Sequence, residues 1–391
     1  MRTVAVICEY NPFHNGHKYC IEQARLRSGA DAVICIMSGS FVQRGECAIL
    51  PRFTRARHAI QSGADVVTEL PACSSFFNAE QFAQAGIKVA DYLNVDCLAF
   101  GSESDNLQSI EKIANVLSRE PDEYKSALKN GLDAGLPFPN AREKALKTLL
   151  PDMSDFDFAA PNDLLAIAYV TAIKRTKSKI VPITIKRIDN GHDSNTPISN
   201  MLSSSAIRNL VLSGKTDEIK NFVPQYVYDD LNTLHYKSDI EDMLLLSRLK
   251  TISKNDLSNI YDVSEGLENR ISECAKTAKT YKEYLESVKT KRYTLSRLKR
   301  ISLYALFNVT KDFVGTFMKA PPYARILAIG KKRKSDLLSL WHDKKNLIGK
   351  YKDLEKADPI CSKLYEFENQ TASITSLITG NLELDSNMVV L

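Results

Sequence analysis

Residues 3–17 read T-V-A-V-I-C-E-Y-N-P-F-H-N-G-H, and this stretch decides how the chain folds. Residues 3–8 are apolar and β-prone, and the Pro, Asn and Gly behind them predict a buried strand that ends in a tight turn. From His17 the apolar residues recur at helical spacing as far as 28–29, which predicts a helix. His14 and His17 therefore lie between the carboxyl end of a strand and the amino end of a helix.

That position suits a phosphate-bearing ligand. Open α/β sheets bind ligands at the carboxyl ends of their strands, and the free N–H groups and positive end of a helix favour phosphate. Two histidines at this spacing also occur as core residues, as a helix cap or as half of a metal site. With the strand and turn before them, however, they resemble the HxGH signature of the nucleotidyltransferase superfamily. That superfamily moves AMP or CMP from a nucleoside triphosphate, so the resemblance implies a site for ATP.

The composition is that of an ordinary globular protein. The chain has 391 residues, 44% of them hydrophobic and 25% charged, which suits two or three domains. It has no apolar run of membrane-spanning length, and its apolar start is broken at Glu9 with no cleavage site behind it, so we expect no signal peptide. The eight cysteines form no C-x-x-C pair. Scattered thiols of this kind indicate a reducing cytoplasm rather than disulfides or a zinc site, so we expect a cytoplasmic protein without a metal site.

The net charge of +5 is unevenly distributed. Residues 1–230 have 25 Lys and Arg against 27 Asp and Glu, whereas residues 231–391 have 27 against 20. Strand signals also fade from about residue 235, where the sequence becomes helical in pattern. We therefore predict two domains, 1–230 and 231–391, and a polyanionic partner for the second.

Strand and helix patterns alternate through the first domain. Further strands are expected at 32–37, 65–71, 97–100 and 180–187, and helices at 51–62, 78–92, 107–118 and 163–174. Alternation at this spacing is typical of βαβ units. The sequence thus predicts an α/β fold with a Rossmann-like parallel sheet, followed by a mostly α-helical C-terminal domain.

A second motif follows the polar loop 189–200. Residues 203–208 read S-S-S-A-I-R and open a predicted helix. Serines before an apolar-periodic run are ordinary helix N-caps. They also resemble S-S-T-x-I-R, the second signature of the same superfamily, in which the hydroxyls and the arginine hold the triphosphate tail. Because both signatures are present, we favour triphosphate binding by Ser203 and Arg208.

Positive charge is concentrated in residues 289–334. This window has thirteen Lys and Arg and one acidic residue, Asp312, with aromatic residues between them. A charge run is more often a solvated helix face, but this excess is large for one. Basic side chains gather backbone phosphates and exposed rings stack on unpaired bases, so we predict nucleic-acid binding. The candidate contacts are Lys291, Arg292, Arg297, Lys299, Arg300, Lys331, Lys332 and Arg333.

Longer blocks extend the match beyond the two signatures. They are V-I-C-E-Y-N-P-F-H-N-G-H (6–17), M-S-G-S-F-V-Q-R-G-E (37–46), R-A-R-H-A-I-Q-S-G-A-D-V-V-T-E-L-P (55–71), A-E-Q-F-A (79–83), F-G-S-E (100–103), A-P-N-D-L-L (160–165) and K-R-I (186–188). Together they resemble the bacterial tRNA(Met) cytidine acetate ligase family over roughly the first 210 residues.

This resemblance implies a reaction in two steps. Acetate attacks the α-phosphate of ATP to give acetyl-adenylate and pyrophosphate. The acetyl group then passes to N4 of the wobble cytidine (C34) of elongator tRNA(Met), giving N4-acetylcytidine. Residues 1–230 would be the ATP-binding nucleotidyltransferase domain and residues 231–391 the tRNA-binding domain, and Mg²⁺ is expected only as the ion carried with ATP.

The resemblance also assigns individual residues. The implied catalytic residues are His14, His17 and Arg208. The implied ATP contacts are Ile7, Cys8, Glu9, Tyr10, Asn11, Pro12, Phe13, His14, Asn15, Gly16, His17, Lys18, Tyr19, Cys20, Gly101, Asn162, Arg187, Ile188 and Ser203. The sequence departs from the family pattern at three places: Arg52 replaces a usual Lys, Asp163 replaces a usual Asn and adds a negative charge near the nucleotide, and Ser204-Ser205 replace Ala-Thr.

Two other functions remain open on the sequence. A nucleotidyltransferase that joins AMP to a phosphate-bearing coenzyme precursor would use the same signatures, although such enzymes are usually short single domains. A non-catalytic RNA-binding protein would keep the fold without the chemistry. The intact residues His14, His17 and Arg208 weigh against that second alternative.

Overall fold

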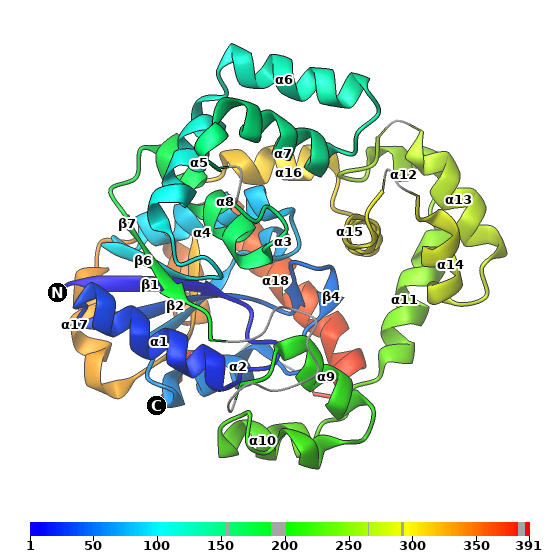
Figure 1. Cartoon of the computed structure of the whole chain (residues 1–391). Coiled ribbons are helices and arrows are strands. Elements are labelled where there is room, and N and C mark those ends of the chain that lie inside the picture. The colour runs from blue at the N-terminus through cyan, green and yellow to red at the C-terminus, as the bar shows by residue number, and fades with distance from the viewer. Residues whose placement is uncertain (154–155, 189–200, 265, 291–292, 382–387) are drawn as a thin grey trace.

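The computed structural model describes residues 1–153, 156–188, 201–264, 266–290, 293–381 and 388–391. The predicted loop 189–200 and two of the candidate nucleic-acid contacts, Lys291 and Arg292, lie outside the described residues. Figure 1 shows a sheet with helices on both faces and a further group of helices on one side.

The central sheet has the predicted α/β arrangement. Among the described residues, its strands lie in the order β10-β8-β5-β2-β1-β6-β7, with β9 beside β8. The strands β5, β2, β1, β6 and β7 pair in parallel, which confirms the predicted Rossmann-like sheet. The bounds of the strands are β1 Thr3–Cys8, β2 Ala32–Ser38, β5 Val66–Leu70, β6 Cys97–Ser102, β7 Val181–Lys186, β8 Ala324–Ile329, β9 Leu347–Ile348 and β10 Val389–Val390.

The boundary expected at residues 230/231 does not match the sheet. Strand β8 belongs to the second half of the chain, yet it pairs antiparallel with β5, so that Ile329 lies opposite Val66. All six residues of β8 are buried. An apolar run of this length fits a buried strand or a buried helix equally well, and only pairing with β5 decides between them. The C-terminal half therefore completes the sheet as well as forming helices.

Helices cover both faces of the sheet because side chains alternate along each strand. Val4 and Val6 face α1 (Asn15–Ser28), α2 (Arg52–Gln61), α9 (Ser204–Leu212) and α10 (Gln225–Asn232) in one core. Ala5 faces the opposite way, toward α4 (Ala79–Tyr92), α5 (Leu107–Arg119) and α8 (Pro161–Thr176) in another. This alternation places β1 in the middle of the molecule, buried on both sides.

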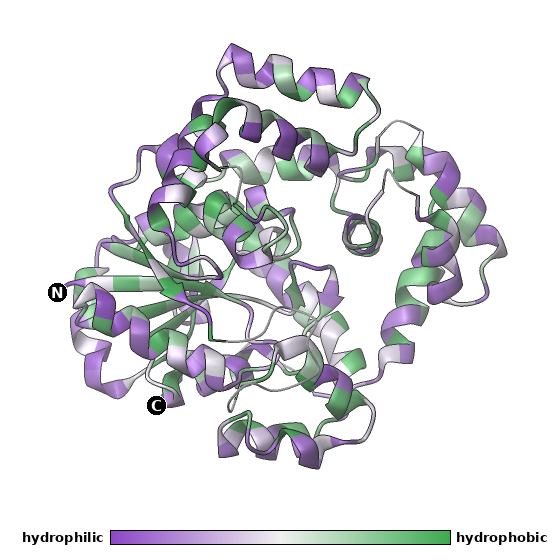
Figure 2. Cartoon of the chain, in the orientation of Figure 1, coloured by the Kyte–Doolittle hydropathy of each residue, from purple (hydrophilic) through white to green (hydrophobic). Residues whose placement is uncertain are grey.

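The other helices form a third core and an outer hairpin. The third core lies between α3, α11, α13 to α16 and α18, and α6 packs on α7 at the periphery. Figure 2 shows hydrophobic residues on the strands and on inward helix faces, with hydrophilic residues outside. None of the described helices is both long enough and apolar enough to cross a membrane. The bounds are α3 Ala72–Ser75, α6 Asp122–Asp133, α7 Phe138–Leu149, α11 Ser238–Thr251, α12 Lys254–Asn259, α13 Leu267–Thr277, α14 Tyr281–Val288, α15 Leu295–Leu306, α16 Lys311–Lys319, α17 Lys334–Leu340 and α18 Pro359–Thr379, with 3-10 turns at Pro151–Met153, Thr216–Ile219, Lys331–Arg333 and Tyr351–Lys356.

A buried ionic network ties the C-terminal helix α18 to the sheet. One guanidinium nitrogen of Arg52 lies 3.0 and 2.9 Å from the two carboxylate oxygens of Glu69, and both side chains are fully buried. Beside them, Glu368 of α18 accepts a hydrogen bond from the Tyr323 hydroxyl at 2.9 Å. Burial, together with the charge of Glu69, raises the pKa of Glu368 to about 8. Arg52, which replaces the family's usual Lys, therefore forms an ion pair with Glu69 in the core.

Candidate active site

The two histidines lie at the point where the strand order reverses. β1 pairs with β2 on one side and with β6 on the other, so the chain segments that leave β1 and β6 lie at the carboxyl edge of the sheet, where open α/β sheets have their ligand-binding crevice. Helix α1 begins at Asn15 rather than at the expected His17, and His14 is its N-cap. The helix starts there because the extended backbone of His14 lets its side chain accept the first free N–H group.

His14 and His17 form a stacked pair held by a reciprocal cap. The Nδ1 atom of His14 accepts from the backbone N–H of Gly16 at 3.0 Å, and Nδ1 of His17 accepts from the backbone N–H of His14 at 3.3 Å. The ring centroids are 3.7 Å apart with an interplanar angle of 23°. Because Nδ1 is an acceptor in both rings, the neutral form of each carries its proton on Nε2. Each ring thus carries one N–H group, a donor of the kind that binds phosphate oxygens.

Buried aromatic residues support the pair from below. Tyr10 and Phe13 are 2% and 0% exposed, and their ring centroids lie 4.9 and 5.5 Å from that of His17. Burial, with smaller effects of His14 and Arg187, lowers the pKa of His17 well below its usual value. His17 is therefore a neutral hydrogen-bond donor at physiological pH.

The second signature packs directly onto the first. Ser203 is the N-cap of α9, and its hydroxyl accepts from the backbone N–H of Ala206. The next hydroxyl, of Ser204, donates to the carbonyl of Pro12 at 3.3 Å. Arg208, one turn along α9, donates from its guanidinium to the carbonyl of Asn11 at 2.7 Å. The two motifs, nearly 200 residues apart in the chain, are thus brought together at one edge of the sheet.

The segment after β6 lies on the other side of the point where the strand order reverses. Arg187 lies against Gly101, where a Cβ atom would come within 3.5 Å of its side chain, and it donates to the side-chain carbonyl of Asn162 at 3.2 Å. The distance of 3.5 Å is an ordinary van der Waals contact, so the crossing of Arg187 does not itself require glycine at position 101. Asn162 and Asp163 stand at the start of α8, and their backbone N–H groups donate to the carboxylate of Glu103.

Two of these residues correct the interpretation of the sequence. Asp163 is 1% exposed, and its carboxylate accepts from the Ser102 hydroxyl and from the backbone N–H of Ser104, so it braces the turn after β6 rather than facing the nucleotide. Glu103 was not predicted as a functional residue, although it ends the F-G-S-E block. It occupies the positive end of α8, which makes that helix end unavailable to a phosphate.

Arg55 is a second residue that the sequence did not single out. Its side chain is fully buried, and it donates to the backbone carbonyls of Leu50, Glu9, Ser38 and Gly39. One guanidinium therefore ties the segments that follow β1 and β2. The signal available in the sequence was its position in the R-A-R-H-A-I-Q block.

The side chains of the other predicted ATP contacts differ in exposure. Cys8, Asn11 and Pro12 are buried, so only their backbone can meet a ligand, as at Tyr10 and Phe13. Lys18 and Ile188 are exposed. Ile7, Glu9, Asn15, Gly16, Tyr19, Cys20, Gly101, Asn162, Arg187 and Ser203 are partly buried.

The three candidate contacts in α15 are paired or buried. The side chain of Arg297 pairs with Asp262 at 3.1 Å, and Lys299 pairs with Glu46 at 2.6 Å. Arg300 is 7% exposed and lies in the core. The rings expected to stack on bases are buried as well: Tyr293, Tyr304, Phe307, Phe317 and Tyr323 are all buried and Phe313 is partly buried. These basic and aromatic residues are spaced so that most of them face the third core, which a count of charges does not reveal.

The other three candidate contacts that the structure describes lie at the opposite edge of the sheet. Because β8 is antiparallel, its last residue, Ile329, pairs with the first residue of β5. Lys331, Lys332 and Arg333 follow directly and therefore lie at the amino edge, away from His14 and His17. In Figure 1, α17, which follows this turn, and α15 are on opposite sides of the molecule. The six predicted contacts that the structure describes thus do not form one continuous surface.

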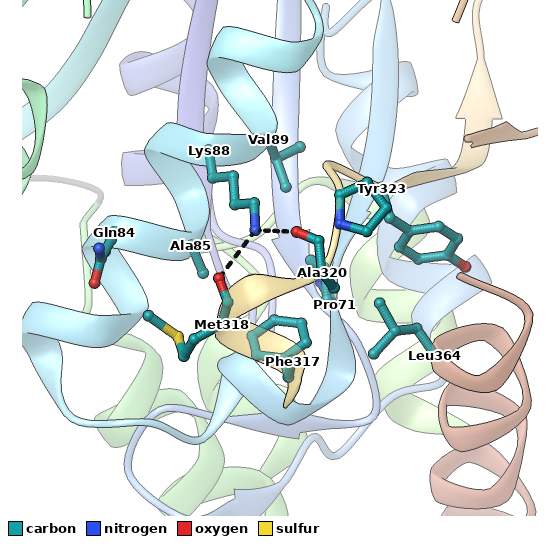
Figure 3. A pocket seen from close by; sticks show the side chains of 11 residues that line it. Pro71, Gln84, Ala85, Lys88, Val89, Phe317, Met318, Ala320, Tyr323 and Leu364 are labelled. Atoms are coloured by element: carbon teal, nitrogen blue, oxygen red, sulfur yellow. Dashed lines mark hydrogen bonds between the residues drawn. The ribbon is translucent and has the colours of Figure 1, made fainter. Parts of the chain in front are cut away.

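An apolar cavity of about 60 Å³ lies elsewhere, between α4 and the end of α16. Figure 3 shows Lys88 at its wall, where the ammonium group donates to the carbonyls of Met318 and Ala320. Lys88 thereby caps the end of α16. The cavity is far too small for a nucleotide, and its lining contains none of the predicted site residues.

The structure offers no metal cage within its described residues: it has no group of three or more His, Cys, Asp or Glu side chains that could hold a metal ion there. The positive groups at the carboxyl edge of the sheet include the side chains of Arg187 and Arg208 and the amino end of α1. The arrangement can hold a polyphosphate by N–H donors and guanidinium groups.

Known proteins are similar to this chain over nearly its whole length. Residues 1–387 match the family model described as HIGH Nucleotidyl Transferase. The chain is 38% identical to the tRNA(Met) cytidine acetate ligase of Acetivibrio thermocellus over 388 residues, covering 94% of this chain and 93% of that protein. The chain belongs to the tRNA(Met) cytidine acetate ligase family.

Further relatives support membership of this family along the whole chain. The tRNA(Met) cytidine acetate ligase of Clostridium perfringens is 33% identical over 402 residues, with 100% of this chain and 98% of that protein covered. Two crystal structures of TmcAL from Thermotoga maritima cover 100% of both chains: an apo form with a TM-score of 0.91 at 31% identity, and a form bound with alpha-thio ATP with a TM-score of 0.90 at 32% identity. This chain is therefore similar to the family in its helical half as well as in its sheet.

Proposed function

We propose that this chain acetylates the wobble cytidine (C34) of elongator tRNA(Met) to N4-acetylcytidine, using ATP and acetate in the cytoplasm. The relatives named above are tRNA(Met) cytidine acetate ligases, and one solved relative holds alpha-thio ATP. The observation that carries the proposal is the meeting of the two signatures. Arg208 donates to the carbonyl of Asn11, three residues from His14, at the carboxyl edge of the sheet.

In the first step, an oxygen of acetate attacks the α-phosphorus of ATP. The bond between that phosphorus and the bridging oxygen to the β-phosphate breaks, which gives acetyl-adenylate and pyrophosphate. Such a displacement needs in-line positioning and positive charge where the leaving group gathers negative charge. His14 and His17 supply Nε2–H donors for the phosphate oxygens, and Arg208 binds the departing pyrophosphate.

The nucleoside part of ATP lies along the segment after β6. Gly101 permits close approach of the backbone, and Arg187 with Asn162 provides hydrogen-bonding groups at the same edge. Mg²⁺ enters with ATP, bound to its phosphates, as is usual for nucleoside triphosphates. In this proposal the chain contributes hydrogen-bond donors and positive charge, and the ion neutralises part of the charge on the triphosphate.

In the second step, N4 of cytidine attacks the acetyl carbonyl carbon. The bond between that carbon and the phosphate oxygen breaks, AMP leaves and N4 loses a proton. Activation is necessary because the N4 lone pair is delocalised into the ring and is a poor nucleophile toward free acetate. The cytidine must also leave the anticodon stack to reach the adenylate, which requires a protein surface for the RNA beside the crevice.

The decisive experiment is incubation with ATP, acetate and total bacterial tRNA, followed by nucleoside mass spectrometry. We expect N4-acetylcytidine that depends on both ATP and acetate, and pyrophosphate released with it. Isotope-labelled acetate identifies the origin of the acetyl group. Acetylation that fails under these conditions, with pyrophosphate released instead in the presence of a phosphomonoester, would assign the chain to the plain nucleotidyltransferases. Binding of tRNA without release of pyrophosphate would indicate a non-catalytic RNA-binding protein.

A further inference from the structure

A carboxylate stands between the proposed pyrophosphate-binding arginine and the helical half of the chain. One oxygen of Glu46 is 3.6 Å from a guanidinium nitrogen of Arg208, and the other is 2.6 Å from the ammonium nitrogen of Lys299. Glu46 lies on the small hairpin β3 (Phe41–Val42) and β4 (Glu46–Cys47), within the M-S-G-S-F-V-Q-R-G-E block. The hairpin thus joins α9 on one side to α15 on the other.

The hairpin is fixed firmly enough to hold that carboxylate in place. Gly45 has φ +78°, and a Cβ atom there would lie 2.7 Å from the backbone nitrogen of Arg300 in α15. In β4, the backbone N–H of Cys47 donates to the carboxylate of Glu241 at 2.8 Å. The close contact with α15 and the bond to α11 leave little freedom for Glu46 to move between its two partners.

Burial and the neighbouring positive charges have opposite effects on the pKa of Glu46. Burial by itself would raise the pKa of Glu46, but Lys299, and after it Arg208 and Arg44, hold the pKa below its ordinary value. Glu46 is therefore ionised at neutral pH. Its side chain is 32% exposed, and those of Lys299 and Arg208 are 25% and 17% exposed, so ligand phosphates can reach all three groups.

We infer that Glu46 is a positioning residue of the adenylation site, which orients Arg208 and weakens its hold on pyrophosphate, while Lys299 limits that effect by pairing with the same carboxylate. This inference rests on the proposed function, since it takes Arg208 as the group that binds pyrophosphate. An anion that binds Lys299 breaks the pair between Lys299 and Glu46. The carboxylate of Glu46 then has Arg208 as its remaining partner of the two. An RNA phosphate at Lys299 therefore favours release of pyrophosphate, which prevents the adenylate from reverting to ATP.

The test measures binding of inorganic pyrophosphate to the full chain by calorimetry, at fixed ionic strength, in four variants. We expect Glu46→Gln to bind about three- to five-fold more tightly than the unchanged chain, because a partly exposed ion pair that competes with the ligand is removed. Lys299→Met should bind about three- to five-fold more weakly. In the double variant the effect of Lys299→Met should fall below two-fold, since the carboxylate that transmits it is gone.

The matched control is Glu241→Gln. This residue contacts the same hairpin through Cys47, but it makes no ion pair with Arg208 among the described residues. A purely structural role of the hairpin predicts weaker binding in Glu46→Gln and in Glu241→Gln alike. Our inference predicts tighter binding in the first and unchanged binding in the second, so the opposite signs separate the two explanations.

The outcomes separate this inference from the proposed function. Normal pyrophosphate binding by the unchanged chain, with equal or weaker binding by Glu46→Gln, overturns the role of Glu46 alone. Additive effects in the double variant overturn the coupling through Lys299. Failure of the unchanged chain both to bind pyrophosphate and to exchange it into ATP in the presence of acetate overturns the proposed function and this inference with it.

Discussion

Replacing His17 by Ala tests the proposed site most directly. The change removes the imidazole ring whose centroid lies 3.7 Å from that of His14, and with it the Nε2–H donor and the Nδ1 acceptor of the cap. Loss of one preorganised donor at a developing charge lowers kcat by about 100- to 1,000-fold. Loss of the cap leaves the backbone N–H of His14 without that acceptor, which costs about 1 kcal/mol of stability and leaves the chain folded.

The assay is acetate-dependent exchange of labelled pyrophosphate into ATP, beside direct measurement of tRNA binding. We expect exchange by His17→Ala to fall by at least 100-fold, in line with the loss of one such donor, while its affinity for tRNA stays within two-fold, because the donor serves only the phosphates. His17→Gln is the control. Glutamine at this position accepts the bond from the N-cap N–H, as in an ordinary capping box, but it lacks the imidazole.

Two results would refute this reasoning. Exchange by His17→Ala within ten-fold of normal would remove His17 from the mechanism. Full activity in His17→Gln would show that the cap, not the ring, is what matters. The lowered pKa of His17 adds a pH criterion: the residue stays neutral as the pH falls through its ordinary range. The exchange rates of the unchanged chain and of His17→Gln should therefore depend on pH in the same way between about pH 6 and 8.

Three further predictions concern the rest of the molecule. Arg52→Met should lower the free energy of unfolding by about 3–5 kcal/mol, because it leaves the buried carboxylate of Glu69 unpaired; a loss below about 1 kcal/mol in denaturant titration would contradict this. Because the pKa of Glu368 is raised from 4.5 to about 8, the stability it contributes is complete below pH 4.5 and is lost as the pH rises through 8. Glu368→Gln should abolish that slope, at most about 1.4 kcal/mol per pH unit, in unfolding curves from pH 5 to 8; an unaltered slope would assign it to other groups. Charge reversal of Lys331 and Lys332 should leave pyrophosphate exchange unchanged and lower the salt slope of tRNA binding by about two; an unchanged slope would exclude this edge from the RNA surface.

The helical half was the part that the sequence described least well. The window 289–334 was identified by its charge, but charge counts do not distinguish a solvated face from one that forms ion pairs inside a fold. Arg300 is buried and Lys299 is paired with Glu46, so the two do not form an open basic face. The strand β8 was missed for a similar reason, because its apolar residues carry no period that separates a buried strand from a buried helix.

The sequence by itself determined the parallel sheet, the strand–turn–helix that carries His14 and His17, and the family. These features depend on local pattern: apolar runs, turn residues, helix caps and motif spacing are properties of neighbours along the chain. Only the tertiary structure decided that Arg208 meets Asn11, that β8 closes the sheet, and that Glu46 lies between Arg208 and Lys299. The physical reason is that pairing and burial join residues far apart in sequence, where each partner alone has several possible roles and only contact selects one.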